Sequence, residues 1–301
     1  MADDAMTVTP QFKKECSPTG EYLRQESAFR RSVKAEAGRY HLYVSYACPW
    51  AHRAIIVRKL KGLEDAISLS VVDPIRDERG WTFGDTGGEF ADPINGFKFL
   101  MEAYQATDAS FDGRPSVPVL WDKKEGVIVN NESAEVIRML DCEFHDLGNR
   151  TVDLYPVDHH EEIDRINKRV YREINNGVYR CGFATTQRAY DRAFDTLFSA
   201  LDWVESLLAE RRFLVGDVCT EADWRLFTTL VRFDAVYVGH FKCNLRRIAD
   251  YPHLSRYLAE LVAVPGVAET INMDHIKRHY YVTHRAINPT EIVPKGPELS
   301  F

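Results

Sequence analysis

The first third of the chain alternates between the hydrophobic periods of strands and helices. Residues 40–47 are rich in aromatic and β-branched side chains and predict a strand. Residues 50–62 have helical spacing and end on basic side chains, with Gly62 as a left-handed cap, and residues 66–74 predict a second strand closed by Asp-Pro. Because a strand, a helix and a strand in series form a right-handed parallel unit, we expect the fold to begin this way.

A hairpin and a helix complete this region. Residues 76–99 are rich in Gly, Asp and Phe and are too long for an ordinary connection, which indicates a functional or inserted segment. Residues 117–122 and 127–129 predict two strands around a turn containing Gly126, and residues 132–144 predict a helix. The order is βαβ–ββα, so we expect an α/β domain over residues 39–145, preceded by a polar extension over residues 1–38.

The second half of the chain has almost purely helical periodicity. Four stretches place apolar residues at i, i+3 and i+4: residues 158–177, 186–210, 220–241 and 253–266. Thr220 and Asp223 resemble a capping box, with Thr220 as the N-cap. We therefore expect an all-α domain over residues 155–270. The proline-rich end of the chain predicts an extended tail within residues 271–301.

Composition and charge narrow the class of function. The 301 residues are 45% hydrophobic and 28% charged, as in ordinary globular proteins, and suffice for two domains. The net charge of −7 disfavours nucleic acid and anionic membrane surfaces as partners. No apolar run reaches the roughly 20 residues of a membrane span.

The cysteines and the N-terminus predict a cytoplasmic protein. The six cysteines are scattered without a C-x-x-C pair, which favours reduced thiols over disulfides. The acidic N-terminus has no apolar signal core. Neither His159-His160 nor His240 with Cys243 has the spacing of metal ligands, so no metal site is expected.

Cys48 lies where the first predicted strand ends and the first helix begins. Unpaired N–H groups and the helix dipole stabilise a thiolate at such a position. Pro49 suits the first helical turn, and His52 and Arg53 could add positive charge there. The alternative is a buried, inert cysteine. Because Ala51 stands where a dithiol enzyme has its second cysteine, a reactive Cys48 must pass its oxidation to an external thiol, for which glutathione is the obvious cytosolic candidate.

Two further features fit a glutathione site. Val117 precedes Pro118. A cis peptide bond there would expose the Val117 backbone, so that an extended ligand could pair with it like an added strand. A plain trans proline is the alternative. Glu132 and Ser133 open a predicted helix and could hold the ammonium and carboxylate of a γ-glutamyl group. They could equally form an ordinary helix start.

Six segments then carry a family resemblance, in this order along the chain: CPWAHR at 48–53, GWTF at 80–83, VPVLWD at 117–122, NES at 131–133, NNGVY at 175–179 and INPT at 287–290. Together they resemble the xi class of glutathione transferases, the glutathionyl-hydroquinone reductases. The resemblance covers nearly all of the chain after about residue 35. It implies a thioredoxin-like α/β N-terminal domain, an all-α C-terminal domain, a tail near the site and a homodimer. It also implies glutathione as co-substrate, with no metal or prosthetic group.

The resemblance assigns roles in glutathione binding. Cys48 would be the nucleophile. The other implied contacts are to the indole of Trp81, to Arg114 near the glycyl carboxylate, to the main chain of Val117 before a cis Pro118, and to Glu132 and Ser133 at the γ-glutamyl end. The chain departs from the family pattern at Pro115, which removes a backbone donor next to Arg114.

Three tyrosines of the second half also match the family. Read alone, each lies among apolar neighbours and could be a core tyrosine. The resemblance places Tyr179, Tyr237 and Tyr280 over the thiol as catalytic and hydroquinone-binding residues, with Tyr179 as the first choice of proton donor. Tyr281 follows Tyr280 directly; on a helix the two would diverge by about 100°, so only one should face the site.

The implied reaction is reduction of an aromatic glutathionyl conjugate. The Cys48 thiolate would attack the glutathione sulfur of an S-glutathionyl-hydroquinone, and a second glutathione would resolve the mixed disulfide. An omega-type thiol transferase or dehydroascorbate reductase would share this thiol chemistry without needing three tyrosines. A non-catalytic ligand-binding module on the same scaffold is a further alternative.

Overall fold

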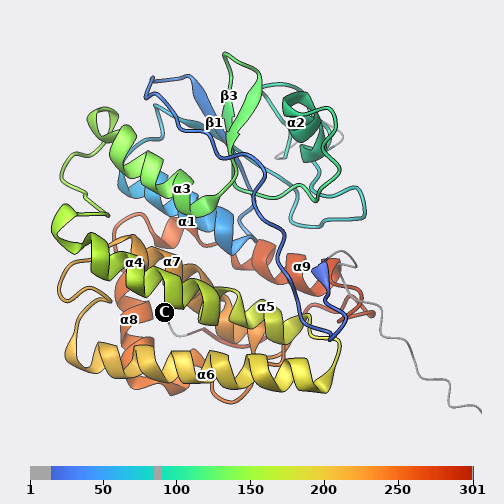
Figure 1. Cartoon of the computed structure of the whole chain (residues 1–301), viewed down its shortest axis with the longest axis vertical. Helices are drawn as coiled ribbons and strands as arrows, with labels where there is room; N and C mark the ends of the chain where they lie inside the picture. Colours follow the sequence, from blue (N-terminus) through green and yellow to red (C-terminus); the bar gives the residue numbers. More distant parts are fainter. Residues whose placement is uncertain (1–14, 85–89, 300) are drawn as a thin grey trace, which may run out of the picture.

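The computed structural model describes residues 15–84, 90–299 and 301, and it forms two domains that share one interface (Figure 1). Residues 1–14 of the predicted extension and residues 85–89 of the predicted long passage lie outside the described residues. The first domain contains a four-stranded sheet, and the second is a bundle of helices. No helix in the described ranges is long and apolar enough to cross a membrane.

The sheet has the strand order β2-β1-β3-β4. Strand β1 (Tyr40–Val44) pairs parallel with β2 (Ser68–Val71) and antiparallel with β3 (Val119–Asp122), which forms a hairpin with β4 (Val127–Asn130). Helix α1 (Pro49–Leu60) connects β1 to β2, so the parallel unit and the hairpin predicted from hydrophobic spacing are both confirmed. Every side chain of β1 is buried, because helices cover the sheet.

The predicted element order lacks one helix. Helix α2 (Leu100–Thr107) follows the long passage, and Glu102 accepts hydrogen bonds from the N–H groups of Lys98 and Phe99 at its start. With only eight residues, α2 has too few turns for the 3.6-residue period to stand out from the surrounding Phe-rich sequence. Helix α3 (Ser133–Arg138) continues as a π-helical turn over Met139–Glu143.

The second domain is helical, as the periodicity predicts. Its α-helices are α4 (His160–Arg169), α5 (Gly177–Gly182), α6 (Gln187–Glu210), α7 (Glu221–Arg232), α8 (Pro252–Val262) and α9 (Met273–Thr283). Short 3₁₀ or π segments cover His145–Leu147, Val157–His159, Val170–Asn175, Phe233–Tyr237, Ile248–Asp250 and Ala268–Thr270. The capping box at the start of α7 is confirmed, since the Thr220 N–H donates to the Asp223 carboxylate at 2.8 Å.

The expectation of an extended tail is wrong for its first part. Helix α9 occupies Met273–Thr283, where Asn272 caps the start by accepting a hydrogen bond from the His275 N–H. This stretch is rich in aromatic and basic side chains, so its residues give only a weak 3.6-residue hydrophobic period and the helix was not predicted. Residues 284–299 have no regular secondary structure, as the proline content predicts.

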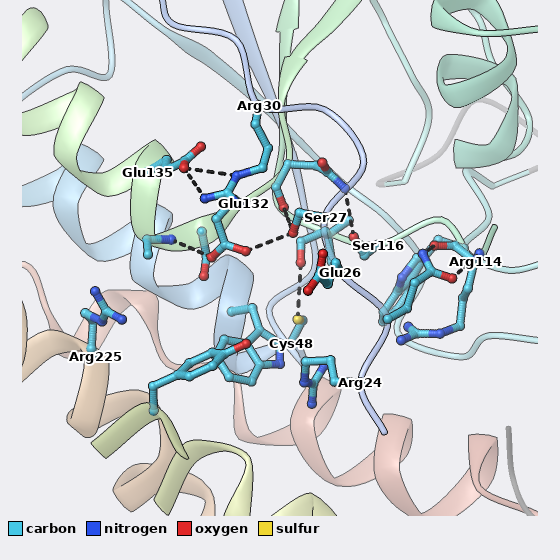
Figure 2. A pocket seen from close by; sticks show the side chains of 18 residues that line it. Arg24, Glu26, Ser27, Arg30, Cys48, Arg114, Ser116, Glu132, Glu135 and Arg225 are labelled. Carbon is cyan, nitrogen blue, oxygen red and sulfur yellow. Dashed lines mark hydrogen bonds and ion pairs between the residues drawn. The ribbon is translucent and has the colours of Figure 1, made fainter. Parts of the chain in front are cut away.

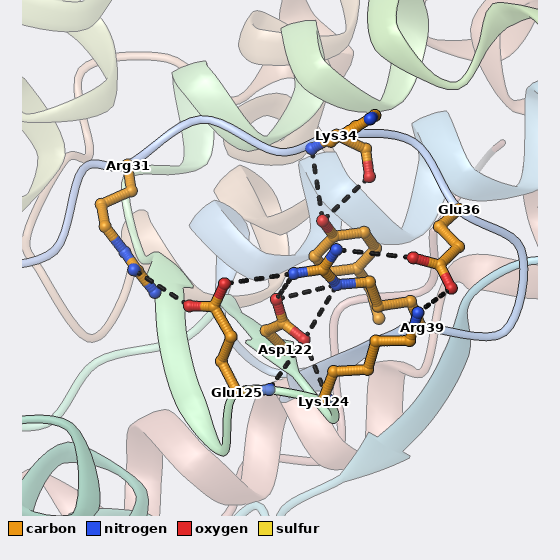
Figure 3. A network of polar contacts seen from close by, with 8 residues as sticks. Arg31, Lys34, Glu36, Arg39, Asp122, Lys124 and Glu125 are labelled. Atoms are coloured by element: carbon orange, nitrogen blue, oxygen red, sulfur yellow. Dashed lines mark hydrogen bonds and ion pairs between the residues drawn. The ribbon is translucent and has the colours of Figure 1, made fainter.

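The segment before β1 is held against both domains (Figure 1). Residues 22–31, hereafter the N-terminal strap, exchange backbone hydrogen bonds with the end of β4, from the Arg31 N–H to the Val129 carbonyl and from the Asn131 N–H to the Phe29 carbonyl. Arg31, the last residue of the strap, pairs with Glu125, and Arg39 beyond the strap forms a two-pronged ion pair with Asp122 on β3 (Figure 3). The predicted polar extension is therefore, in its described part, an ordered cover.

Candidate active site

Cys48 occupies the N-cap of α1, with φ −79° and ψ 121°. The chain leaves β1 at Val44, and Pro49 fills the first turn of the helix, where its missing N–H costs nothing. The half-buried Cys48 Sγ lies 3.5 Å from the Val117 carbonyl oxygen. The sulfur thus stands at the mouth of a helix N-terminus, as the sequence predicts, and beside the backbone of the Val117–Pro118 turn, whose peptide bond is cis.

The first turn of α1 carries one cation and not two. His52 is fully buried; its Nδ1 accepts a hydrogen bond from Arg232, and burial followed by the Arg232 charge holds its pKa well below the usual value. The expectation that His52 adds positive charge is therefore wrong. Arg53 is also buried, and desolvation lowers its pKa to about 9, so it remains a cation near neutral pH.

Arg232 of α7 fastens the turn that precedes Cys48. Its Nε donates to the Ala47 carbonyl at 3.0 Å and its Nη2 to the Tyr46 carbonyl at 2.8 Å. The same fully buried guanidinium donates to His52. One side chain of the helical domain thereby fixes the backbone just before the nucleophile position and contacts the His52 side chain just after it.

A cavity of about 360 Å³, the Cys48 groove, opens beside the sulfur (Figure 2). Its lining combines the thioredoxin-like half, the N-terminal strap and two residues of the helical domain: Arg24, Gln25, Glu26, Ser27, Arg30, Cys48, Trp50, Trp81, Arg114, Ser116, Val117, Asn131, Glu132, Ser133, Ala134, Glu135, Tyr171 and Arg225. All five residues predicted to bind glutathione lie in this lining. The groove is therefore long enough to reach from the α3 N-terminus past Cys48 to Arg114.

Glu132 and Ser133 lie at one end of the groove. Glu132 is the N-cap of α3, and its carboxylate accepts hydrogen bonds from the Ala134 N–H at 3.1 Å and from the Ser27 hydroxyl at 2.9 Å. Arg53 donates to the Ser133 hydroxyl at 3.3 Å. The predicted helix opening is thus confirmed, and it carries acidic, hydroxyl and backbone N–H groups together.

Trp81 and Arg114 lie at the other end. The Trp81 indole is almost fully buried and stacks on His279 of α9, with ring centroids 4.9 Å apart. Arg114 forms an ion pair with Glu15 at 2.7 Å. Both residues line the groove and also a second, smaller cavity that begins at Cys48.

This second cavity, the phenol pocket, has a volume of about 50 Å³ and lies under the helical domain. It is lined by Tyr22, Arg24, Cys48, Pro49, Trp50, Arg76, Trp81, Arg114, Tyr179, Phe183, His279, Tyr280 and His284. The Tyr280 hydroxyl lies 2.7 Å from that of Tyr179 and 2.9 Å from that of Tyr237. The structure therefore brings the three predicted tyrosines into one hydrogen-bonded chain.

The tyrosines are not equivalent. Tyr179 and Tyr280 line the pocket, whereas Tyr237 is fully buried beside them. Burial raises the pKa of all three phenols, and at Tyr179 the charge of Arg24 is the strongest opposing influence. Tyr281 points elsewhere and donates to the Ala235 carbonyl, which confirms that only one of the adjacent pair faces the site.

Sequence reasoning missed the residues that the strap and the C-terminal helix bring in. Arg24 and Ser27 come from the segment assigned only as an extension, and His279 from a tail expected to be extended. Arg24 and Ser27 lie more than twenty positions from any predicted site residue, and His279 lies on a helix that was not predicted. The position of His279 directly before Tyr280, a predicted site residue, was the one local signal that could have indicated it.

Comparisons with known proteins agree with this geometry. The glutathione S-transferase N-terminal domain matches residues 47–143, and the C-terminal domain matches residues 187–260. The chain is 55% identical over 285 residues to the glutathionyl-hydroquinone reductase PcpF of Sphingobium chlorophenolicum, covering 93% of this chain and 91% of that protein. It is 49% identical over 296 residues to the glutathionyl-hydroquinone reductase YqjG of Escherichia coli, covering 93% and 90%.

Solved structures extend the comparison to three dimensions. Glutathione-bound YqjG has a TM-score of 0.86 and 51% identity over 89% of this chain and 87% of that one. The Xi enzyme of Phanerochaete chrysosporium has a TM-score of 0.91 and 47% identity over 94% of both chains. This chain belongs to the glutathione S-transferase family. Within that family it is a member of the Xi class, so the predicted resemblance and fold are confirmed.

Proposed function

We propose that this protein is a glutathionyl-hydroquinone reductase whose nucleophile is Cys48. The observation that carries the proposal is the position of the Cys48 sulfur at the junction of two cavities, the Cys48 groove and the phenol pocket. A conjugate of glutathione with an aromatic ring has one part for each cavity, and the bond to be broken lies between them. The names of the 49–55% identical relatives agree with this activity.

The groove supplies groups that match glutathione along its length. Glu132 would hold the γ-glutamyl ammonium, and the Ser133 hydroxyl with the α3 N-terminus would hold its carboxylate. The Val117 main chain would pair with the cysteinyl backbone in the manner of an added strand. The Trp81 indole and the Arg114 guanidinium would contact the glycyl end. Glutathione-bound YqjG supports a glutathione site in this fold.

The reaction begins with attack of the Cys48 thiolate on the glutathione sulfur. In the keto tautomer of the substrate, the ring carbon bonded to sulfur is next to a carbonyl. The sulfur–carbon bond breaks, the electron pair passes to that carbonyl oxygen, and a Cys48–glutathione disulfide forms. A phenol of the tyrosine chain then protonates the hydroquinone anion, with Tyr179 as the donor. A second glutathione thiolate attacks the mixed disulfide, releasing oxidised glutathione and the Cys48 thiolate.

The decisive experiment compares Cys48→Ser with the control Cys142→Ser, which changes an exposed thiol away from both cavities. Only Cys48→Ser should abolish reduction of glutathionyl-menadiol, and only the wild type and the control should show a glutathionyl adduct on the peptide containing residue 48. Full turnover by Cys48→Ser would refute the proposal. High activity on a ring-free mixed disulfide together with none on glutathionyl-menadiol would instead favour the omega-type thiol transferase. A homodimer and a cytoplasmic location stay predictions.

A further inference from the structure

Arg24 of the N-terminal strap lies where the two cavities meet. Five side chains line both of them: Arg24, Cys48, Trp50, Trp81 and Arg114. Figure 2 shows the Arg24 side chain beside Cys48 and directed away from Glu132, toward the helical domain. Arg24 therefore stands next to the sulfur but on the side of the phenol pocket.

The Arg24 guanidinium is held in a fixed place. Its Nε donates to the Asn176 side-chain oxygen at 2.6 Å. Its central carbon lies 4.6 Å from the ring centroids of both Trp50 and Tyr179, and 5.5 Å from that of Tyr22. Aromatic faces attract a guanidinium, and the hydrogen bond sets its rotation, so the cation is positioned before any ligand arrives.

One donor group of Arg24 is left over. Its Nη2 is buried and has no hydrogen-bond acceptor among the described residues. A buried donor without a partner is costly, and native structures rarely keep one without a reason. Arg114, the other cation at the junction, has a carboxylate partner in Glu15, whereas no ion pair with a carboxylate is found for Arg24 among the described residues. The unused donor thus points to an acceptor that arrives with the substrate.

The chemistry of the proposed reaction provides such an acceptor. When the sulfur–carbon bond breaks, the electron pair moves onto an oxygen of the ring, and negative charge appears in the phenol pocket. The pocket is lined largely by aromatic side chains, so water stabilises this charge little, and a fixed cation next to it lowers the barrier. Burial lowers the pKa of Arg24, but the neighbouring phenols and the Glu15 carboxylate together raise the pKa above its usual value, so the side chain stays charged.

We propose that Arg24 is a further catalytic residue, which donates a hydrogen bond from Nη2 to the ring oxygen as that oxygen becomes an anion. The proposal rests on the proposed function. Arg24 transfers no proton: the thiolate supplies the electrons, the Tyr179 phenol supplies the proton, and Arg24 stabilises the anion between these two events. The role makes the strap a part of the ring site, although it lies outside both matched family domains.

The test separates the ring chemistry from the thiol chemistry. Arg24→Met and Arg24→Lys are assayed on glutathionyl-menadiol and on the mixed disulfide of glutathione with 2-mercaptoethanol, which has no ring. We expect kcat for glutathionyl-menadiol to fall about 100-fold in Arg24→Met, as for loss of one oxyanion donor, with a smaller fall in Arg24→Lys. Turnover of the ring-free disulfide should be nearly unchanged. The matched control is Arg31→Met, which removes an exposed strap arginine that pairs with Glu125.

Chemical rescue covers the case in which the strap itself is disturbed. Guanidinium ion added to Arg24→Ala should restore part of the glutathionyl-menadiol activity and leave the ring-free reaction alone. Equal losses in both reactions, or a raised KM for glutathione with an unchanged kcat, would overturn the proposal and assign Arg24 to glutathione binding or to structure. If the wild type itself failed on glutathionyl-menadiol, the proposed function would fail instead, so the two failures are distinguishable.

Discussion

The hydroxyls of Tyr179 on α5 and Tyr280 on α9 lie 2.7 Å apart, although 101 positions separate them in the chain. Tyr280 also contacts the Tyr237 hydroxyl at 2.9 Å. Two hydrogen bonds among three phenols use two of the three protons, so one proton remains for the substrate. Tyr237 is fully buried and Tyr179 lines the pocket, so we infer that the hydrogen bonds run from Tyr237 through Tyr280 to Tyr179 and leave that proton at Tyr179.

Removal of single hydroxyls should therefore have graded effects. We expect Tyr179→Phe to lower kcat for glutathionyl-menadiol by roughly 10²- to 10⁴-fold, the usual contribution of a general acid. Tyr237→Phe should lose less, since it removes only support for Tyr280. Steady-state kinetics of both variants, with the ring-free mixed disulfide as the control substrate, give the comparison. A larger loss in Tyr237→Phe would reverse the inferred direction of the chain.

Gly182 should not tolerate a side chain. A Cβ at this last residue of α5 would lie 2.1 Å from the Phe241 ring, which stacks on Tyr237 with centroids 5.4 Å apart. We expect Gly182→Ala to lower the free energy of unfolding by about 1–3 kcal/mol, the usual cost of overpacking, and to lower kcat by moving the phenols. Urea unfolding measures the first effect. In the control Gly239→Ala, the nearest atom to the new Cβ is the Tyr281 hydroxyl at 3.4 Å, and unfolding should change little.

Arg232 should matter for both stability and activity. Its removal leaves the Tyr46 and Ala47 carbonyls without this partner next to the nucleophile. Each buried group left unsatisfied costs about 1–3 kcal/mol, so Arg232→Met should be destabilised by roughly 3 kcal/mol. Thermal unfolding and the rate of Cys48 alkylation test this expectation.

The control for that variant is Arg247→Met, which removes an exposed ion pair with Asp250. Exposed pairs contribute about 0–1 kcal/mol. If Arg232→Met unfolded at the same temperature as Arg247→Met, the buried guanidinium would not be holding the turn.

Stability should fall as the pH is lowered from about 6.5 to about 4. Burial lowers the pKa of His240 to about 4, so the unfolded chain binds a proton in this window and the folded chain does not. The stabilisation is therefore complete at pH values above the pKa that His240 has in the unfolded chain. It is lost as the pH falls toward the pKa that His240 has in the folded chain. For His240 the loss is roughly 3 kcal/mol, because each pKa unit between the folded and the unfolded state corresponds to about 1.36 kcal/mol.

Urea unfolding at a series of pH values between 7 and 4 measures this dependence. Buried His41 and His279 act in the same direction, with pKa values of about 4 and about 3, so the wild-type slope should exceed that of one histidine. His240→Asn should flatten the profile. An unchanged slope in this variant would contradict the assignment of a buried neutral imidazole.

Much of the fold, and the places of Cys48, Glu132 and Ser133 in the Cys48 groove, could be predicted from the sequence because the signals are local. The β1–α1–β2 unit, the hairpin and the helix opening at Glu132 each depend on neighbours within about ten positions. Cys48 was identified by its place between a strand and a helix. Helix α2 and helix α9 were missed, because a short helix and one rich in aromatic residues give weak periodicity.

The charges of the site could not be predicted in the same way. His52 follows Cys48 within one turn and was expected to add positive charge, yet burial, followed by the charge of Arg232 180 positions away, lowers its pKa and leaves it a neutral acceptor. Arg24 gave no local signal, since its surroundings of Trp50, Tyr179 and Asn176 come from other elements. A protonation state depends on burial and on nearby charges, and both are set by residues that are distant in the sequence.

The sequence by itself determined the class of this protein, its order of strands and helices, and the position of its thiol at a helix N-terminus. These features follow from hydrophobic periods and from the conformational limits of Pro and Gly, which act over a few residues. Only the tertiary structure decided that three phenols share one chain of hydrogen bonds and that the N-terminal strap delivers a cation to the junction of the two cavities. Such contacts join distant segments, and they form only where packing of the two domains brings those segments together.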